Sequence, residues 1–213
     1  MVSKPTFTEP TQSEPTLSES DIRYVLAEYR TLGQLCEGRA QSVAEVQALI
    51  SGGRLPQATY VLPSGEARFP PDYFALVDEA GGVDALPARF RARYLAASAT
   101  SPSADADADE DWAGYLTGQF GVCLRSVTPE SMAEKNRLIR RIEALVETPA
   151  GGDVAWREQL RATVDALDEI ERPFTDFDRQ RWADTSRGRH IDRMRERYPA
   201  AFGKAFEGRE SMV

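Results

Sequence analysis

Few side chains in this sequence are of the types that transfer protons or attack as nucleophiles. The chain has one histidine, His190, and two cysteines, Cys36 and Cys123. Histidine titrates near neutral pH, so His190 is a catalytic candidate as general acid or base. The thiolate of a cysteine is a nucleophile, so Cys123 is a second catalytic candidate. The structural alternatives are a surface histidine among arginines and a small buried hydrophobic cysteine.

Arginines gather around the histidine. Residues 178–197 contain seven arginines and four acidic residues, a local charge of +3 in a chain whose net charge is −8. Such a cluster can bind a phosphate, a carboxylate substrate or an acidic carrier protein, but it is also typical of a solvated helix face. The residues that we expect to bind substrate are Tyr115, Arg179, Arg181 and Arg187.

The sequence offers little for a metal or a nucleotide. Zinc sites use mainly Cys and His, and one His with two distant Cys gives too few ligands. Asp176 and Asp178 form an Asp-x-Asp pair that suits Mg²⁺, yet such pairs are also common at helix starts, where carboxylates interact with the helix dipole. No P-loop, dinucleotide-binding glycine pattern or Gly-x-Ser-x-Gly motif occurs. We therefore predict no metal and no cofactor.

These residues need a scaffold, and its first part is predicted to be a small winged-helix-like lobe with the helices that follow it, residues 18–98. Ser18, Thr31 and Ser42 each precede an amphipathic segment that they can cap as a helix. The second and third of these helices have the layout of a helix-turn-helix. Tyr-Val-Leu and Ala-Arg-Phe, on either side of a Pro-Ser-Gly-Glu turn, then predict a β-hairpin. Residues 1–17 are predicted to be a disordered tail.

The second part is predicted to be a helical bundle, residues 111–213, joined to the lobe by an acidic linker at residues 99–110. Apolar side chains recur at helical spacing in three stretches of the bundle. Gly118 and Gly121 interrupt the first stretch, and each costs about 1 kcal/mol relative to alanine, so close approach of another helix or of a ligand should compensate. The predicted fold class is mainly α, with one β-hairpin.

The helix-turn-helix lacks the charge of a DNA reader. Its second helix, SVAEVQALIS, has no basic residue, and the charges of residues 31–54 sum to zero. A protein needs several phosphate contacts for useful affinity at physiological salt, so this pattern disfavours nucleic acid as a partner.

Three segments together resemble a bacterial family of uncharacterised proteins associated with natural-product biosynthesis gene clusters. They are "TLGQLCEGR" with the hairpin that follows, "YLTGQFGVCLRSVTPE" and "ERPFTDFDRQRW". The resemblance implies a role in specialised metabolism, with no catalytic residues to carry over. The first segment also resembles the helix-turn-helix of excisionase-like proteins, although its recognition helix lacks their basic residues.

Our leading hypothesis is a protein of secondary metabolism that binds an organic intermediate or a carrier-bound substrate, with acid–base catalysis as its chemistry if it is an enzyme. The alternatives are a cluster-situated transcriptional regulator and a non-catalytic interaction module. No apolar run approaches the roughly 18 residues of a membrane span, and the polar start lacks the features of a signal peptide. We expect a cytoplasmic protein without a membrane partner, which can form a homodimer.

Overall fold

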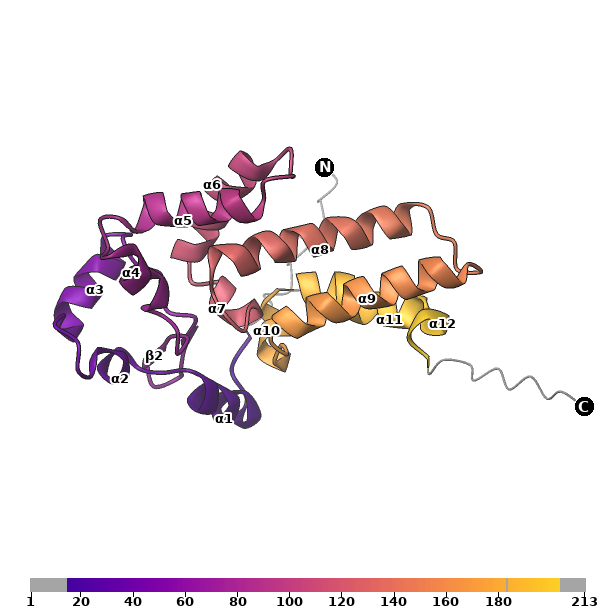
Figure 1. Cartoon of the computed structure of the whole chain (residues 1–213). Coiled ribbons are helices and arrows are strands. Elements are labelled where there is room, and N and C mark those ends of the chain that lie inside the picture. Colours follow the sequence, from indigo (N-terminus) through magenta and orange to yellow (C-terminus); the bar gives the residue numbers. More distant parts are fainter. Residues whose placement is uncertain (1–14, 183, 204–213) are drawn as a thin grey trace, which may run out of the picture.

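The computed structural model describes residues 15–182 and 184–203, and these residues form a mainly helical fold with one small β-hairpin (Figure 1). The predicted fold class is confirmed. The elements of the first half are α1 (Glu19–Glu28), α2 (Leu32–Cys36), α3 (Val43–Ser51), β1 (Tyr60–Val61), β2 (Ala67–Arg68), α4 (Ala75–Ala80) and α5 (Leu86–Ala97). Those of the second half are α6 (Ala104–Leu116), α7 (Phe120–Cys123), α8 (Pro129–Glu147), α9 (Val154–Ile170), α10 (Asp176–Arg181), the π-helix η1 (Gly188–Asp192), α11 (Arg193–Arg197) and α12 (Pro199–Phe202).

The first three helices begin where their capping residues predict. Ser18, Thr31 and Ser42 each accept a hydrogen bond from the backbone amide three residues on, and the side chain at that position returns a bond to the cap. Each such cap stabilises its helix by about 1 kcal/mol. The predicted tail falls mostly on residues 1–14, which lie outside the described residues.

The hairpin after α3 is short. Tyr60 pairs with Arg68 and Val61 with Ala67 in antiparallel register. Gly65 has a φ of 84° in the turn, a left-handed conformation that glycine adopts at little cost. Two short helices and the hairpin are thus present, whereas the likeness to helix-turn-helix and winged-helix proteins stays a prediction.

The prediction of an acidic linker at residues 99–110 is wrong, because α6 begins at Ala104 and runs through the segment. Two arginines from neighbouring helices pair with three of its carboxylates. Arg91 of α5 pairs with Asp105 and Asp109, and Arg140 of α8 lies 2.8 Å from Asp107. With those charges paired, α6 packs against α5 and α8. The predicted boundary at residue 111 therefore falls inside a helix.

Helices α8 and α9 lie side by side and run in opposite directions (Figure 1). The stripe predicted for α9 is confirmed, since all of its members are buried: Trp156, Leu160, Val164 and Leu167. On α8, Met132 and Ile142 are fully buried, and the Trp156 indole donates to the Leu145 carbonyl at 3.0 Å. The two helices form one apolar core with η1, α11 and α12.

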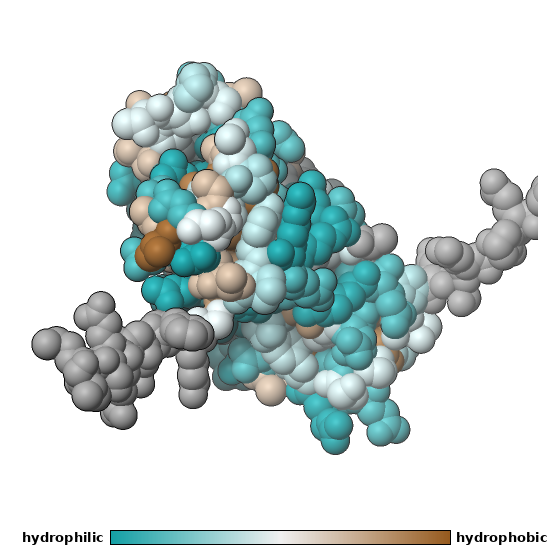
Figure 2. Space-filling model, turned by 90° about the vertical axis from the view of Figure 1, so that its right-hand side faces the viewer, coloured by the Kyte–Doolittle hydropathy of each residue, from teal (hydrophilic) through white to brown (hydrophobic). Residues whose placement is uncertain are grey.

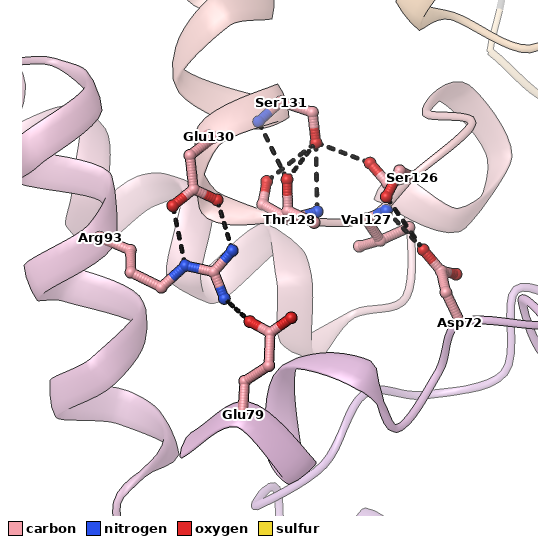
Figure 3. Close-up of polar contacts among 8 residues, drawn as sticks. All are labelled: Asp72, Glu79, Arg93, Ser126, Val127, Thr128, Glu130 and Ser131. Atoms are coloured by element: carbon pink, nitrogen blue, oxygen red, sulfur yellow. Dashed lines mark hydrogen bonds and ion pairs between the residues drawn. The ribbon is translucent and has the colours of Figure 1, made fainter.

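The start of α8 is tied to the first half of the chain (Figure 3). Thr128 and Ser131 form a capping box at this end. Arg93 of α5 donates to both carboxylate oxygens of Glu130, at 2.8 and 2.7 Å, and also pairs with Glu79 of α4. These contacts fix where α8 begins, and hence where the side chains of its second turn lie.

The glycines are closely approached, but by the segment before β1 and not by another helix, and Gly118 lies between α6 and α7 with a φ of 77°. A Cβ at Gly118 would overlap the Gln57 carbonyl oxygen, and one at Gly121 would overlap the Thr59 hydroxyl. The Gln57 amide donates to the Leu116 carbonyl at 2.9 Å. The segment that leads into β1 therefore packs directly on the α6–α7 turn.

None of the helices in the described ranges is long and apolar enough to cross a membrane. The face of the molecule in Figure 2 is mostly hydrophilic, with hydrophobic residues scattered over it.

Candidate functional site

A pocket of about 380 Å³ lies where α6, α7 and α8 meet the segment between α10 and η1. We call it the Lys135 pocket. Its polar lining residues are Glu110, Asp111, Gln119, Cys123, Lys135, Asp184, Thr185, Ser186 and Arg189, and its apolar ones are Phe120, Val122, Phe174 and Trp182. The volume is within the range of small-molecule sites.

Lys135 is buried because it stands on the inner face of α8. It follows Met132 by three residues and precedes Leu138 by three, and both of these are in the core. Its side chain is 9% exposed, and its ammonium nitrogen lies 3.1 Å from Glu171 Oε1. A buried ammonium needs such a partner, because removing an ion from water costs several kcal/mol.

Glu171 is placed by a local β-bridge between two loops. Leu124, just after α7, pairs with Glu171, just after α9, and the Arg172 amide donates to the Cys123 carbonyl at 2.9 Å. The Glu171 side chain is fully buried, and Ser186 donates its hydroxyl proton to Glu171 Oε1 at 2.9 Å. The bridge thus brings Cys123, Lys135 and the carboxylate together.

The charges in this cluster decide what Cys123 can do. Burial raises the pKa of the Cys123 thiol, so the thiol is neutral at neutral pH. Burial alone would lower the pKa of Lys135, but the facing Cys123 and Glu171 outweigh it and raise that pKa. Lys135 is therefore an ammonium ion paired with Glu171. A neutral thiol is a poor nucleophile, which favours the structural alternative for Cys123.

Asp111 is the second buried ionisable group of the pocket. It is 8% exposed, and its Oδ2 accepts a hydrogen bond from the Asn136 amide at 2.9 Å. The same amide donates to the Tyr94 hydroxyl. Burial raises the pKa of Asp111 to about 6; the Tyr94 hydroxyl opposes this shift, and the charge of Glu110 adds to it. The carboxyl therefore changes its protonation state close to neutral pH.

His190 is buried, not on the surface. It is 6% exposed and lines a different groove, of about 510 Å³, between α8 and the helices η1 and α11. Its Nε2 lies 3.1 Å from Glu143 Oε1, and its Nδ1 lies 3.1 Å from the Ser186 carbonyl oxygen. Both neighbours are acceptors, and a neutral imidazole has one N–H to offer them. His190 does not line the Lys135 pocket; its Nδ1 contacts the backbone of Ser186, which does, and the adjacent Arg189 lines both cavities.

The residues expected to bind substrate are not brought together. Tyr115 is buried beside an enclosed cavity of about 20 Å³ in another part of the core. The Arg179 guanidinium lies 2.8 Å from Asp192, and that of Arg187 lies 2.5 Å from Asp168. Arg181 stacks over Trp182, with 4.6 Å between its guanidinium carbon and the ring centroid. Of the sequence candidates, Cys123 alone lines the pocket.

Asp178 belongs to a helix cap. It accepts a hydrogen bond from the Thr175 hydroxyl at 2.7 Å and another from the Tyr60 hydroxyl at 2.9 Å. These bonds favour the helix-start interpretation of the Asp176 and Asp178 pair. Within the described residues, no three His, Cys, Asp or Glu side chains come together in the manner of a metal site.

Sequence reasoning missed Asp111, Lys135 and Glu171. Two of them carried a usable signal, since Lys135 interrupts the apolar stripe of α8, and Asp111 falls on the same face of α6 as the buried Ala108 and Tyr115. Glu171 carried no such signal in the sequence, because it lies in a loop and is buried by contacts with residues distant in the chain.

The arginines of the helix-turn-helix and hairpin region are engaged in ion pairs. Arg39 lies 2.5 Å from Asp78, Arg54 pairs with Asp84, and Arg68 pairs with Glu66. Arg68 is also buried, so its guanidinium is withdrawn from the surface.

These features define a helical protein with a small pocket that contains buried ionisable groups. Residues 85–199, more than half of the chain, match the model of a family of unknown function (DUF6058), and the chain belongs to this family. The match contains every residue that lines the Lys135 pocket and begins after the hairpin. No curated protein and no solved structure matches the chain.

Proposed function

We propose that this protein binds a small organic molecule in the Lys135 pocket. The observation that supports the proposal is that Asp111 and Lys135 are both more than nine-tenths buried and both face a cavity of about 380 Å³. Buried ionisable groups are costly, and they cluster at functional sites where a ligand or a reaction needs them.

Acid–base chemistry is the reaction type that these groups suit. A catalytic acid or base works best with a pKa near the operating pH, and the pKa of Asp111 is raised to about 6. Lys135, which is paired with Glu171, would keep the charge of that buried carboxylate compensated. Cys123 would line the pocket as an uncharged side chain. No step in this scheme needs a cofactor.

The resemblance to proteins of natural-product gene clusters suggests the kind of molecule. We propose an intermediate of specialised metabolism, either free or attached to a carrier protein. The pocket residues all lie within the family match at residues 85–199, which supports the pocket as the site that family members share.

The ion pairs weigh against the two alternatives. A DNA-binding regulator would need arginines free to contact phosphates, and those at positions 39, 54 and 68 are paired with carboxylates. A module that docks an acidic partner would need the arginines of residues 178–197, several of which pair with Asp165, Asp168, Asp184 or Asp192.

The test is capture of small molecules by the purified protein from an extract of the producing cells, with identification by mass spectrometry. We expect one compound, or a related set, to be enriched on the wild-type protein and lost with Asp111→Asn or Ser186→Ala. Both substitutions are small and keep neighbouring packing.

Arg137→Gln is the matched control, because Arg137 lies on the exposed face of α8, two residues from Lys135, and pairs only with Glu134. This variant should retain the compound. Equal enrichment on wild-type, pocket and control proteins, or no enrichment at all, would contradict the proposal.

A further inference from the structure

The two positive groups that line the Lys135 pocket already have partners. The Lys135 ammonium lies 3.1 Å from Glu171, and the Arg189 guanidinium lies 3.5 Å from Asp184. An anionic ligand would have to compete with these carboxylates. The positive side of the pocket is therefore largely neutralised before any ligand enters.

The negative groups are in the opposite situation. Glu110 and Asp111 are adjacent on α6 and both line the pocket. Among the described residues neither makes an ion pair, and the hydrogen-bond partner of Asp111 is the neutral amide of Asn136. Two adjacent carboxylates without a counter-ion leave the pocket short of positive charge.

The apolar part of the lining consists largely of aromatic rings, those of Phe120, Phe174 and Trp182. Aromatic faces attract cations, and they also bind the hydrocarbon body of a ligand. Carboxylates beside aromatic rings are the combination that recognises organic ammonium groups.

We infer that the ligand of the Lys135 pocket is a protonated organic amine, with its ammonium group at Glu110 and Asp111 and its apolar body against the aromatic rings. This inference rests on the proposed function and adds the chemical class of the ligand. It also gives a role to the uncompensated carboxylates, since the ligand supplies the missing counter-ion.

The pH dependence of binding follows from Asp111. Asp107 and Glu110 of α6 raise its pKa, and Tyr94 of α5 and Lys135 of α8 lower it, with burial as the largest contribution; the result is about 6. An ammonium group binds the ionised carboxylate, so affinity should be constant above this pH. Below it, affinity should fall by up to about tenfold per pH unit as the carboxyl takes up a proton.

The experiment compares three probes that share a phenyl ring and differ in charge: 2-phenylethylamine, 3-phenylpropionate and 3-phenylpropan-1-ol. Binding to the full-length protein is measured by titration calorimetry at millimolar probe concentrations. We expect the amine to bind at least about tenfold more tightly than the other two, as hydrogen bonds to charged groups contribute roughly 1.5–3 kcal/mol.

Asp111→Asn should remove most of this preference and Glu110→Gln part of it. Asp109→Asn is the matched control, because Asp109 is on the same helix, pairs with Arg91 and lies outside the pocket. Tighter binding of the carboxylate, equal binding of all three probes, or no binding of the amine overturns the inference. If the capture experiment with cell extract nevertheless enriches a compound that Asp111→Asn loses, only the inference about the ligand class is wrong. If both experiments are negative, the proposed function is wrong too.

Discussion

The helix-turn-helix and hairpin region, residues 31–68, and the Lys135 pocket both carry charged side chains, but they place the counter-charges differently. In the first region each arginine pairs with a carboxylate, and in the Arg54–Asp84 pair both side chains are open to water, 48% and 96% exposed. In the pocket, Lys135 and Glu171 pair almost out of contact with water, and Asp111 is buried without an ionic partner.

This difference separates charges that keep a protein soluble from charges that serve a site. Exposed ion pairs contribute about 0–1 kcal/mol to stability. Their presence on a surface therefore does not indicate a function. A buried charge costs several kcal/mol, and a chain that retains one usually needs it. The region that the sequence predicts to be a helix-turn-helix is thus the electrostatically ordinary one.

The largest effect should come from Lys135→Met, which leaves Glu171 buried without its counter-ion. We expect a loss of about 3–5 kcal/mol in the free energy of unfolding, measured with urea. The double variant Lys135→Met/Glu171→Gln should recover much of that loss, because no charge remains buried. Arg137→Gln on the same helix should change stability by less than about 1 kcal/mol. Equal losses in the single and double variants would show that packing, not charge, dominates the cluster.

A smaller loss, about 2–3 kcal/mol, is expected for Gly118→Ala. The residue combines a left-handed φ with direct contact to the Gln57 carbonyl, so both strain and overlap contribute. Gly53→Ala is the control, since Gly53 also has a positive φ but no atom near its Cβ position, and it should lose about 1 kcal/mol. Thermal unfolding of both variants measures the difference; losses of similar size would argue against close packing at the α6–α7 turn.

Asp111→Asn should stabilise the protein by about 1–3 kcal/mol at pH 7. The pKa of Asp111 is raised from 3.8 to about 6 on folding, so its carboxyl favours the folded state most below pH 4 and loses that contribution as pH rises through 6. The variant's advantage should therefore vanish near pH 4. Urea unfolding at both pH values tests this, and a destabilised variant at pH 7 would mean that Asp111 has an ionic partner after all.

The smallest effect should follow Arg54→Gln. Its pair with Asp84 is exposed, so we expect a change of less than about 0.5 kcal/mol in stability. In a mobility-shift assay with random duplex DNA at physiological salt, the wild-type protein should bind as weakly as the variant. A shifted wild-type band that the variant loses would restore the regulator hypothesis.

Much of the fold was predictable because local rules decide it. The caps at Ser18, Thr31 and Ser42 and the apolar stripe of α9 are predicted correctly, since each depends on residues within a few positions of one another. The acidic segment was read wrongly as a linker, because its helix depends on Arg91 and Arg140 from other helices.

The candidate site was largely unpredictable. His190 was a candidate because it is the only histidine in the sequence, yet its side chain lines a separate groove and not the pocket. Cys123, a catalytic candidate from the sequence, lines the pocket, but burial keeps its thiol neutral, a property that residue type alone does not reveal.

The sequence by itself determined the helix starts, the apolar faces and the neutral surface of the helix-turn-helix, because these follow from side-chain type and spacing along the chain. Only the tertiary structure decided which charges are buried and which are paired. The energy of an ionised group depends on its solvent exposure and on the nearest opposite charge, and for Lys135 and Glu171 that neighbour is 36 positions away in the chain and 3.1 Å away in space.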